Sequence, residues 1–67
     1  MYYVQILPDQ HLVDILGRFI NLQIGVWANI SSHTNLIDAK SQVVSYKANQ
    51  YANYQFQIVD KDGNIQN

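Results

Sequence analysis

The chain has 67 residues, with no cysteine, one proline and three glycines, and this length predicts a single domain over residues 1–67. Hydrophobic residues make up 48% of the sequence, which favours a folded core over disorder. The absence of cysteine excludes disulfides and thiolate metal sites. Four basic and five acidic residues give a net charge of −1, so a broad phosphate-binding surface is not expected.

Amide side chains dominate the polar residues: Gln and Asn together outnumber Asp, Glu, Lys and Arg. Amides hydrogen-bond without long-range fields, so such a surface tolerates contact with another surface; the compositional bias of an AT-rich genome is the alternative explanation. The first seven residues lack the basic segment of a secretory signal. No apolar run approaches the ~20 residues that cross a bilayer. These features predict a cytoplasmic protein without membrane contact.

The first predicted strand is 2–7, which is aromatic and β-branched and ends at Pro8. Strict alternation over 20–31 predicts a long second strand. Its apolar face would hold Ile20, Leu22, Ile24, Val26, Ala28 and Ile30. Between these strands, 11–19 fits either a two-turn helix or a short strand that turns at Gly17 and Arg18.

A helix is predicted at about 35–52, because Asn35 and Asp38 supply cap chemistry. On a helical wheel one arc holds Leu36, Ile37, Val43, Val44, Ala48 and Tyr51, and this arc is expected to face the core. Lys40 and Lys47 fall in the same arc. Either their stems lie along the sheet edge with the ammonium groups in solvent, or the two lysines, one heptad apart, face a partner.

The last predicted strand is 54–59, which alternates Tyr54, Phe56 and Ile58 with Gln55, Gln57 and Val59, and 60–64 follows as a turn. The order of elements predicts an α+β fold. Three to four strands would form a small, mostly antiparallel sheet, with the helix on its apolar face.

No catalytic, cofactor or metal site is expected. The run 60–64 resembles the opening of an EF-hand loop, but Ile65 stands where glycine is needed and the acid at position 12 is missing. His11 and His33 have no partner at a ligand or catalytic spacing. The serines lie in no nucleophile motif, and the glycines form no phosphate loop.

The polar face of the sheet is the candidate binding surface, because a tryptophan among amides can anchor a protein, stack a ligand or stay solvated. The candidate partner-binding residues are Trp27, Asn21, Gln23, Asn29, Gln55 and Gln57.

Several features together resemble short bacterial domains of unknown function with ββαβ order. They are Tyr3-x-Gln5, the strand with Trp27, Asp38-Ala39 early in the helix, and Val59-Asp60-Lys61-Asp62-Gly63-Asn64, mainly within 22–64. The resemblance implies a bacterial or phage origin and no catalytic residues. The stretch 11–19 has no counterpart in it.

The leading hypothesis is a small protein–protein interaction module that forms a homodimer through a sheet edge or the amide-rich sheet face. A short chain needs extra buried surface, and its strands carry few charges to block edge pairing. The alternative is a phage- or plasmid-type nucleic-acid-associated regulator, in which aromatic side chains stack on bases and Arg18, Lys40 and Lys47 meet phosphates. The charge balance makes a nucleic-acid partner the weaker hypothesis.

Overall fold

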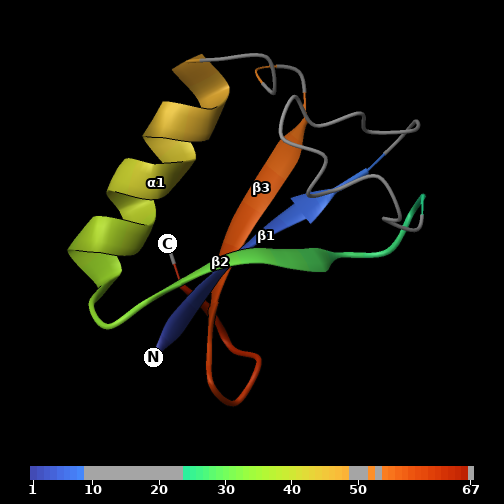
Figure 1. The fold of residues 1–67 in the computed structure, drawn as a ribbon. Helices are drawn as coiled ribbons and strands as arrows, with labels where there is room; N and C mark the ends of the chain where they lie inside the picture. Colours follow the sequence, from blue (N-terminus) through green and yellow to red (C-terminus); the bar gives the residue numbers. More distant parts are fainter. Residues whose placement is uncertain (9–23, 49–51, 53, 67) are drawn as a thin grey trace.

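The computed structural model describes residues 1–8, 24–48, 52 and 54–66. In chain order the elements are β1 (Tyr2–Leu7), β2 (Ala28–His33), α1 (Leu36–Ala48), β3 (Gln55–Asp60) and β4 (Ile65–Gln66). The strands form one antiparallel sheet in the order β2-β1-β3-β4, and α1 packs across one face of it (Figure 1). The predicted α+β fold is therefore confirmed, whereas the stretch 11–19 lies outside the described residues.

β1 is the strand around which the core forms. It has the predicted bounds and pairs with β2 on one side and β3 on the other. Val4 and Ile6 are fully buried under the helix, while Gln5 points to the opposite face because side chains alternate along a strand. The register with β2 shifts between Val4 and Gln5, so β2 carries a bulge there.

The long strand predicted over 20–31 is wrong in its extent, because β2 begins only at Ala28. Gly25 adopts φ +80°, and its N–H donates to the carbonyl oxygen of Pro8 at 2.8 Å. This left-handed turn ends the extended backbone that the alternation indicated. Ile24 and Val26, expected in the core, are each 48% exposed; residues 20–23 lie outside the described part.

α1 begins at the predicted cap. The Asn35 side-chain oxygen accepts from the Asp38 N–H, and the Asn35 amide donates to the Asp38 carboxylate, both at 2.9 Å, which is a reciprocal cap of the helix N-terminus. The described helix ends at Ala48 rather than near 52, which lies in a turn, and 49–51 are outside the described residues.

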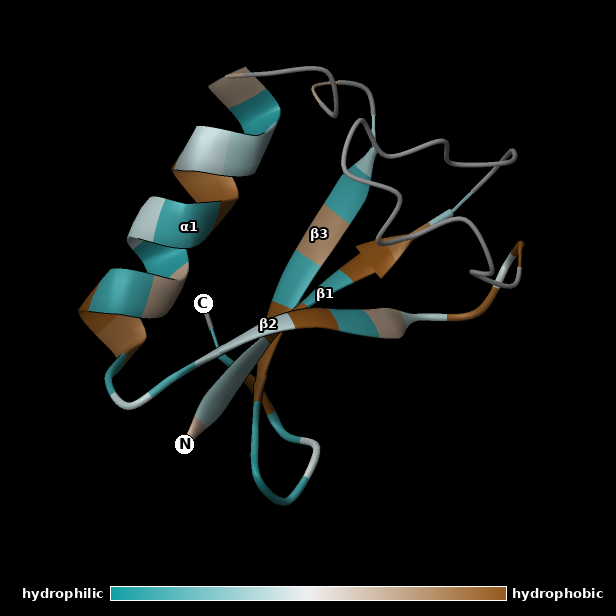
Figure 2. Ribbon diagram, in the orientation of Figure 1, coloured by the Kyte–Doolittle hydropathy of each residue, from teal (hydrophilic) through white to brown (hydrophobic). Residues whose placement is uncertain are grey.

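The face that the helix turns to the sheet overlaps the predicted arc only in part: Leu36 and Val43 pack on the core as expected, whereas the other side of the arc does not. Ala39 is fully buried among Val4 and Ile58, and Leu36, Val43 and Tyr46 pack around them. The ring of Tyr46 stacks on Phe56 with centroids 5.8 Å apart and planes at 4°. Ile37 and Val44, expected in the core, are 76% and 68% exposed, and Ala48 is exposed too. Hydrophobic segments accordingly lie on the outer side of α1 (Figure 2).

β3 runs one residue later than predicted at each end, and Phe56 and Ile58 face the helix as expected. Val59, on the opposite face, is only 6% exposed. The register pairs it with Tyr3 on β1 and Ile65 on β4, so apolar neighbours on both sides account for this burial. The second face of the sheet is therefore not purely polar.

Candidate protein interface

A row of three amides crosses the sheet on the face opposite α1. The Gln57 amide donates to the Gln5 side-chain oxygen at 2.6 Å, and the Gln5 amide donates to the Asn29 side-chain oxygen at 2.7 Å. Backbone pairing produces this row, because Gln5 is the register partner of both Asn29 on β2 and Gln57 on β3. We call Asn29, Gln5 and Gln57 the amide ladder.

The amide ladder connects two of the predicted partner-binding residues, Asn29 and Gln57. The connecting residue is Gln5, which was not among the predicted partner-binding residues. The missed residue, Gln5, was detectable, because it alternates with Val4 and Ile6 in the first predicted strand. Gln55 is exposed two residues before Gln57 on β3, and Trp27 is half-buried directly before β2. The other two candidates, Asn21 and Gln23, lie outside the described residues.

β2 is an edge strand of the described sheet. Its sequence, Ala-Asn-Ile-Ser-Ser-His, contains no lysine, arginine, acid or proline, which are the residues that protect sheet edges from pairing. Asn29 and Ser32 are exposed, while the side chains of Ser31 and His33 engage each other at 2.9 Å between Oγ and Nε2. The bulge is the remaining protective feature of this edge.

The opposite edge is only partly covered. β4 pairs with Ile58 and Val59, and within the described part of the chain no strand pairs with the outer side of Gln55, Phe56 and Gln57. Beside this segment lies a groove of about 190 Å³. It is lined by Lys40 and Val43 of α1, Phe56, Gln57 and Ile58 of β3, and Gln66 of β4.

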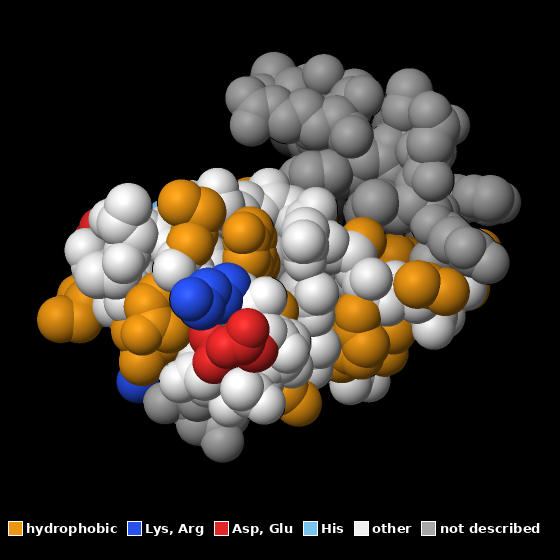
Figure 3. All heavy atoms as spheres, turned by 90° about the horizontal axis from the view of Figure 1, so that it is seen from below, with side chains coloured by type: hydrophobic (Ala, Val, Ile, Leu, Met, Phe, Trp, Pro, Cys, Tyr) orange, Lys and Arg blue, Asp and Glu red, His pale blue; other side chains and the backbone are white. Residues whose placement is uncertain are grey.

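Hydrogen bonds within the segment stabilise the acidic turn between β3 and β4, as expected from the turn predicted over 60–64. One Asp60 oxygen accepts from the backbone N–H groups of Asp62 and Asn64, both at 2.9 Å. The other accepts from the side-chain amides of Asn64 at 3.4 Å and Gln66 at 3.3 Å. The Asp60 carboxylate thus acts as the acceptor of an Asx turn. In Figure 3, which views the molecule from below, acidic and basic side chains lie next to one another.

Lowering the pH should destabilise this turn. The backbone N–H of Asn64, and then that of Asp62, hold the pKa of the Asp60 carboxyl below its ordinary value. A lowered folded-state pKa means that this carboxylate stabilises the turn at pH above the unfolded value of about 4, and that the stabilisation is lost as the pH falls through the lower folded value. We expect the amide chemical shifts of Asp62 and Asn64 to titrate below about pH 4, and the Asp60→Asn variant to lose this titration. A midpoint at or above the ordinary value would contradict the hydrogen-bonding scheme.

Comparison with known proteins found no match: no family model, curated protein or solved structure matches this chain. The likeness to ββαβ domains therefore remains a prediction. Among the described residues, no cluster of three or more potential His, Asp or Glu metal ligands occurs, and no helix has the length and apolarity to span a membrane.

Proposed function

We propose that the chain is a cytoplasmic, non-catalytic protein–protein interaction module that pairs with a second copy of itself along the outer edge of β2. The observation that carries the proposal is this edge, which lacks the charged or proline residues that block strand pairing. The amide ladder supports it, because the ladder reaches the edge at Asn29.

The edge is chemically self-complementary. An amide or hydroxyl both donates and accepts hydrogen bonds, so it can pair with its own copy, whereas a charged group would repel its copy. Residues 31–33 lie beyond the bulge in regular register, and two antiparallel copies centred on Ser32 would place Ser32 opposite Ser32 of the second copy. This side chain is exposed and polar, so the register brings no like charges together.

Light scattering over a concentration series tests the proposal. We expect the solution mass to rise from one to two chains, with a Kd on the order of 100 µM for so short an edge. Ser32→Lys should weaken the dimer by about tenfold or more, because a lysine on an edge strand opposes pairing. Trp27→Ala should also weaken the dimer, because the half-buried ring directly precedes β2.

Gln55→Lys is the matched control, because it adds the same charge at an exposed position on β3, away from β2. It should leave the mass unchanged. If Gln55→Lys disrupts the dimer and Ser32→Lys does not, the copies associate elsewhere and the β2 model is wrong. A mass of one chain at every concentration up to ~1 mM would show that the protein does not self-associate, and the proposal would be wrong.

A further inference from the structure

Ser31 and His33 form a hydrogen-bonded pair on the helix-facing side of β2. The Ser31 Oγ and His33 Nε2 atoms are 2.9 Å apart. The register places Ser31 opposite Val4 and His33 opposite Tyr2 on β1, and both of those β1 residues belong to the core cluster under α1. Because β2 is an edge strand of the described sheet, the other side of this pair borders the edge where we propose that a second copy binds.

Dimer formation would bring two of these pairs together. In the register centred on Ser32, His33 of each copy lies directly opposite Ser31 of the other copy, and directly opposite residues project to the same face of a sheet. The two histidines are then diagonal neighbours, about 7–8 Å apart. This separation is within the Debye length of about 10 Å at roughly 0.1 M salt, so charges on the two rings would interact across the interface.

Protonation leaves the pair within one chain intact. The neutral ring nitrogen accepts from the Ser31 hydroxyl or donates to it, depending on the tautomer, and the protonated ring still donates to the hydroxyl oxygen. A proton on His33 therefore does not disrupt β2 itself. In the dimer, protonation places two positive charges near each other at the paired edges, and like charges on neighbouring strands oppose pairing.

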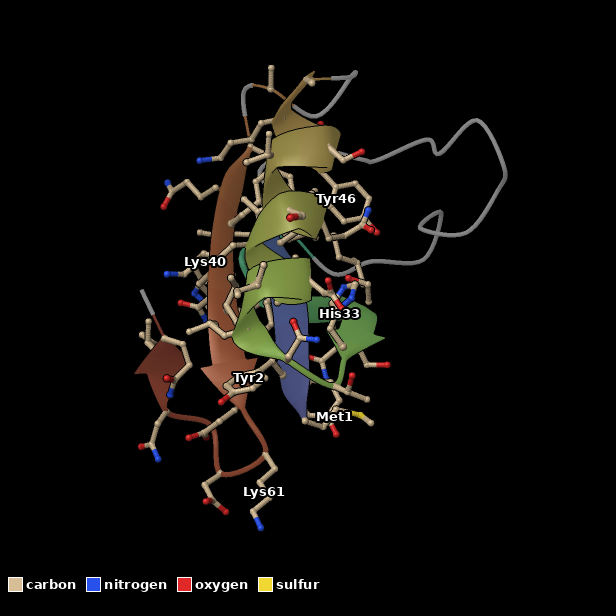
Figure 4. All side chains as sticks on the ribbon, turned by 90° about the vertical axis from the view of Figure 1, so that its left-hand side faces the viewer. Met1, Tyr2, His33, Lys40, Tyr46 and Lys61 are labelled. Atoms are coloured by element: carbon tan, nitrogen blue, oxygen red, sulfur yellow. The ribbon has the colours of Figure 1, made fainter. Side chains whose placement is uncertain are left out.

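The elements that pack against β2 carry several other ionisable groups. They are the Met1 amine, Tyr2 and Tyr3 on the side of β1, and Asp38, Lys40, Tyr46 and Lys47 on α1. Figure 4 shows Lys40 and His33 on opposite sides of α1, and the Asp38 carboxylate already accepts from the Asn35 amide. Of these classes of group, imidazole and the terminal amine are the ones that ordinarily change charge between about pH 8 and pH 5.

We propose that protonation of His33 opposes the pairing of the two β2 edges, so that the dimer forms at neutral and alkaline pH and weakens as the pH falls towards about 5. This inference rests on the β2 dimer proposed above and adds a regulation of that same interface.

Light scattering over the same concentration series at about pH 8 and about pH 5.5, at constant ionic strength, tests the inference. We expect the Kd of the dimer to rise about fivefold or more at the lower pH. Raising the salt concentration to ~1 M should reduce this rise to less than about twofold, because the Debye length then falls to about 3 Å.

Two histidine variants identify the group that titrates. His33→Gln removes the charge and keeps an amide that can bond to Ser31, so its Kd should change less than about twofold between the two pH values. His11→Gln is the matched control, because it makes the same replacement at the other histidine of the sequence. It should keep the pH dependence of the wild-type protein.

The contrary results distinguish this inference from the dimer itself. If the wild-type protein dimerises equally at both pH values, the inference is wrong and the β2 dimer stands. The inference is also wrong if the pH dependence persists in His33→Gln, which would implicate the terminal amine, or disappears in His11→Gln. A mass of one chain at both pH values would refute the dimer, and this inference with it.

Discussion

Ile6→Ala should lower the free energy of unfolding by about 3 kcal/mol. Ile6 lies in the central part of the sheet on β1 and is fully buried. The partly buried side chains that pack on it come from β2, α1, β3 and the segment before β3: Ala28, Ile30, Tyr46, Tyr54 and Phe56. Truncation leaves a cavity that all of these elements border. A domain of this size has roughly 3–10 kcal/mol of stability in total, so much of the variant should be unfolded in mild urea.

Ile37→Ala is the matched control, since it removes the same atoms from a side chain that is 76% exposed. We expect a change within about 0.5 kcal/mol. Both variants should be measured by urea denaturation at a fixed, low protein concentration, because dimer formation would otherwise add to the stability. Similar losses in the two variants would mean that α1 packs with the face that the helical wheel predicted.

Features specified by neighbouring residues were the ones predicted well from the sequence. β1 carries its aromatic and β-branched residues within six positions, and Asn35 with Asp38 marks the helix start within one turn. The turn at Asp60 likewise needs only acceptors and donors within six residues. In each case the interaction that decides the structure is local, so the sequence pattern contains it.

The extent of β2 could not be obtained from alternation. The period-two pattern passes through Gly25 without a break, but alternation does not specify φ at a glycine. The left-handed turn is fixed by a hydrogen bond to Pro8, seventeen residues earlier in the chain. That bond depends on the pairing of β1 with β2, so the strand boundary is a tertiary property.

The helix face was predicted only in part, for a related reason: Leu36 and Val43 pack on the core as expected, but Ile37 and Val44 do not. The wheel ranked residues by hydrophobicity and gave the centre of the arc to large aliphatic side chains, so it omitted Ala39 and Tyr46. The sheet instead selects by shape: the small Ala39 is fully buried against Val4 and Ile58, and the Tyr46 ring stacks on Phe56. Ile37 and Val44 are left outside, and Lys40 is brought to the groove.

The candidate interface was predictable as a face but not as a network. Alternation identified Asn29 and Gln57 as residues that point away from the helix. Their connection through Gln5 joins positions 24 and 52 residues apart in the chain, and it requires the order β2-β1-β3. Strand order is not encoded in the period of any one segment.

Because Ala39 packs between α1 and the sheet, enlarging its side chain should affect both the stability and the groove beside β3. Ala39 is fully buried against Val4 and Ile58. Ala39→Leu should destabilise the fold by about 2 kcal/mol through overpacking, and the helix can accommodate the added atoms only by moving outward. Since Lys40 and Val43 move with it, the amide chemical shifts of Phe56 and Gln57 across the groove should change even where the variant is folded.

Ala48→Leu is the control, because it adds the same atoms on the same helix at an exposed position. We expect its stability to change by less than about 0.5 kcal/mol and the amide shifts of Phe56 and Gln57 to stay the same. Urea denaturation and the amide shifts of Phe56 and Gln57 measure both effects. If Ala39→Leu is as stable as Ala48→Leu, the helix does not rest on the sheet at Ala39, and the groove between α1 and β3 would have to be formed differently. If Ala39→Leu is destabilised but leaves the amide shifts of Phe56 and Gln57 unchanged, the helix does not move at the groove, and the added atoms are accommodated elsewhere in the core.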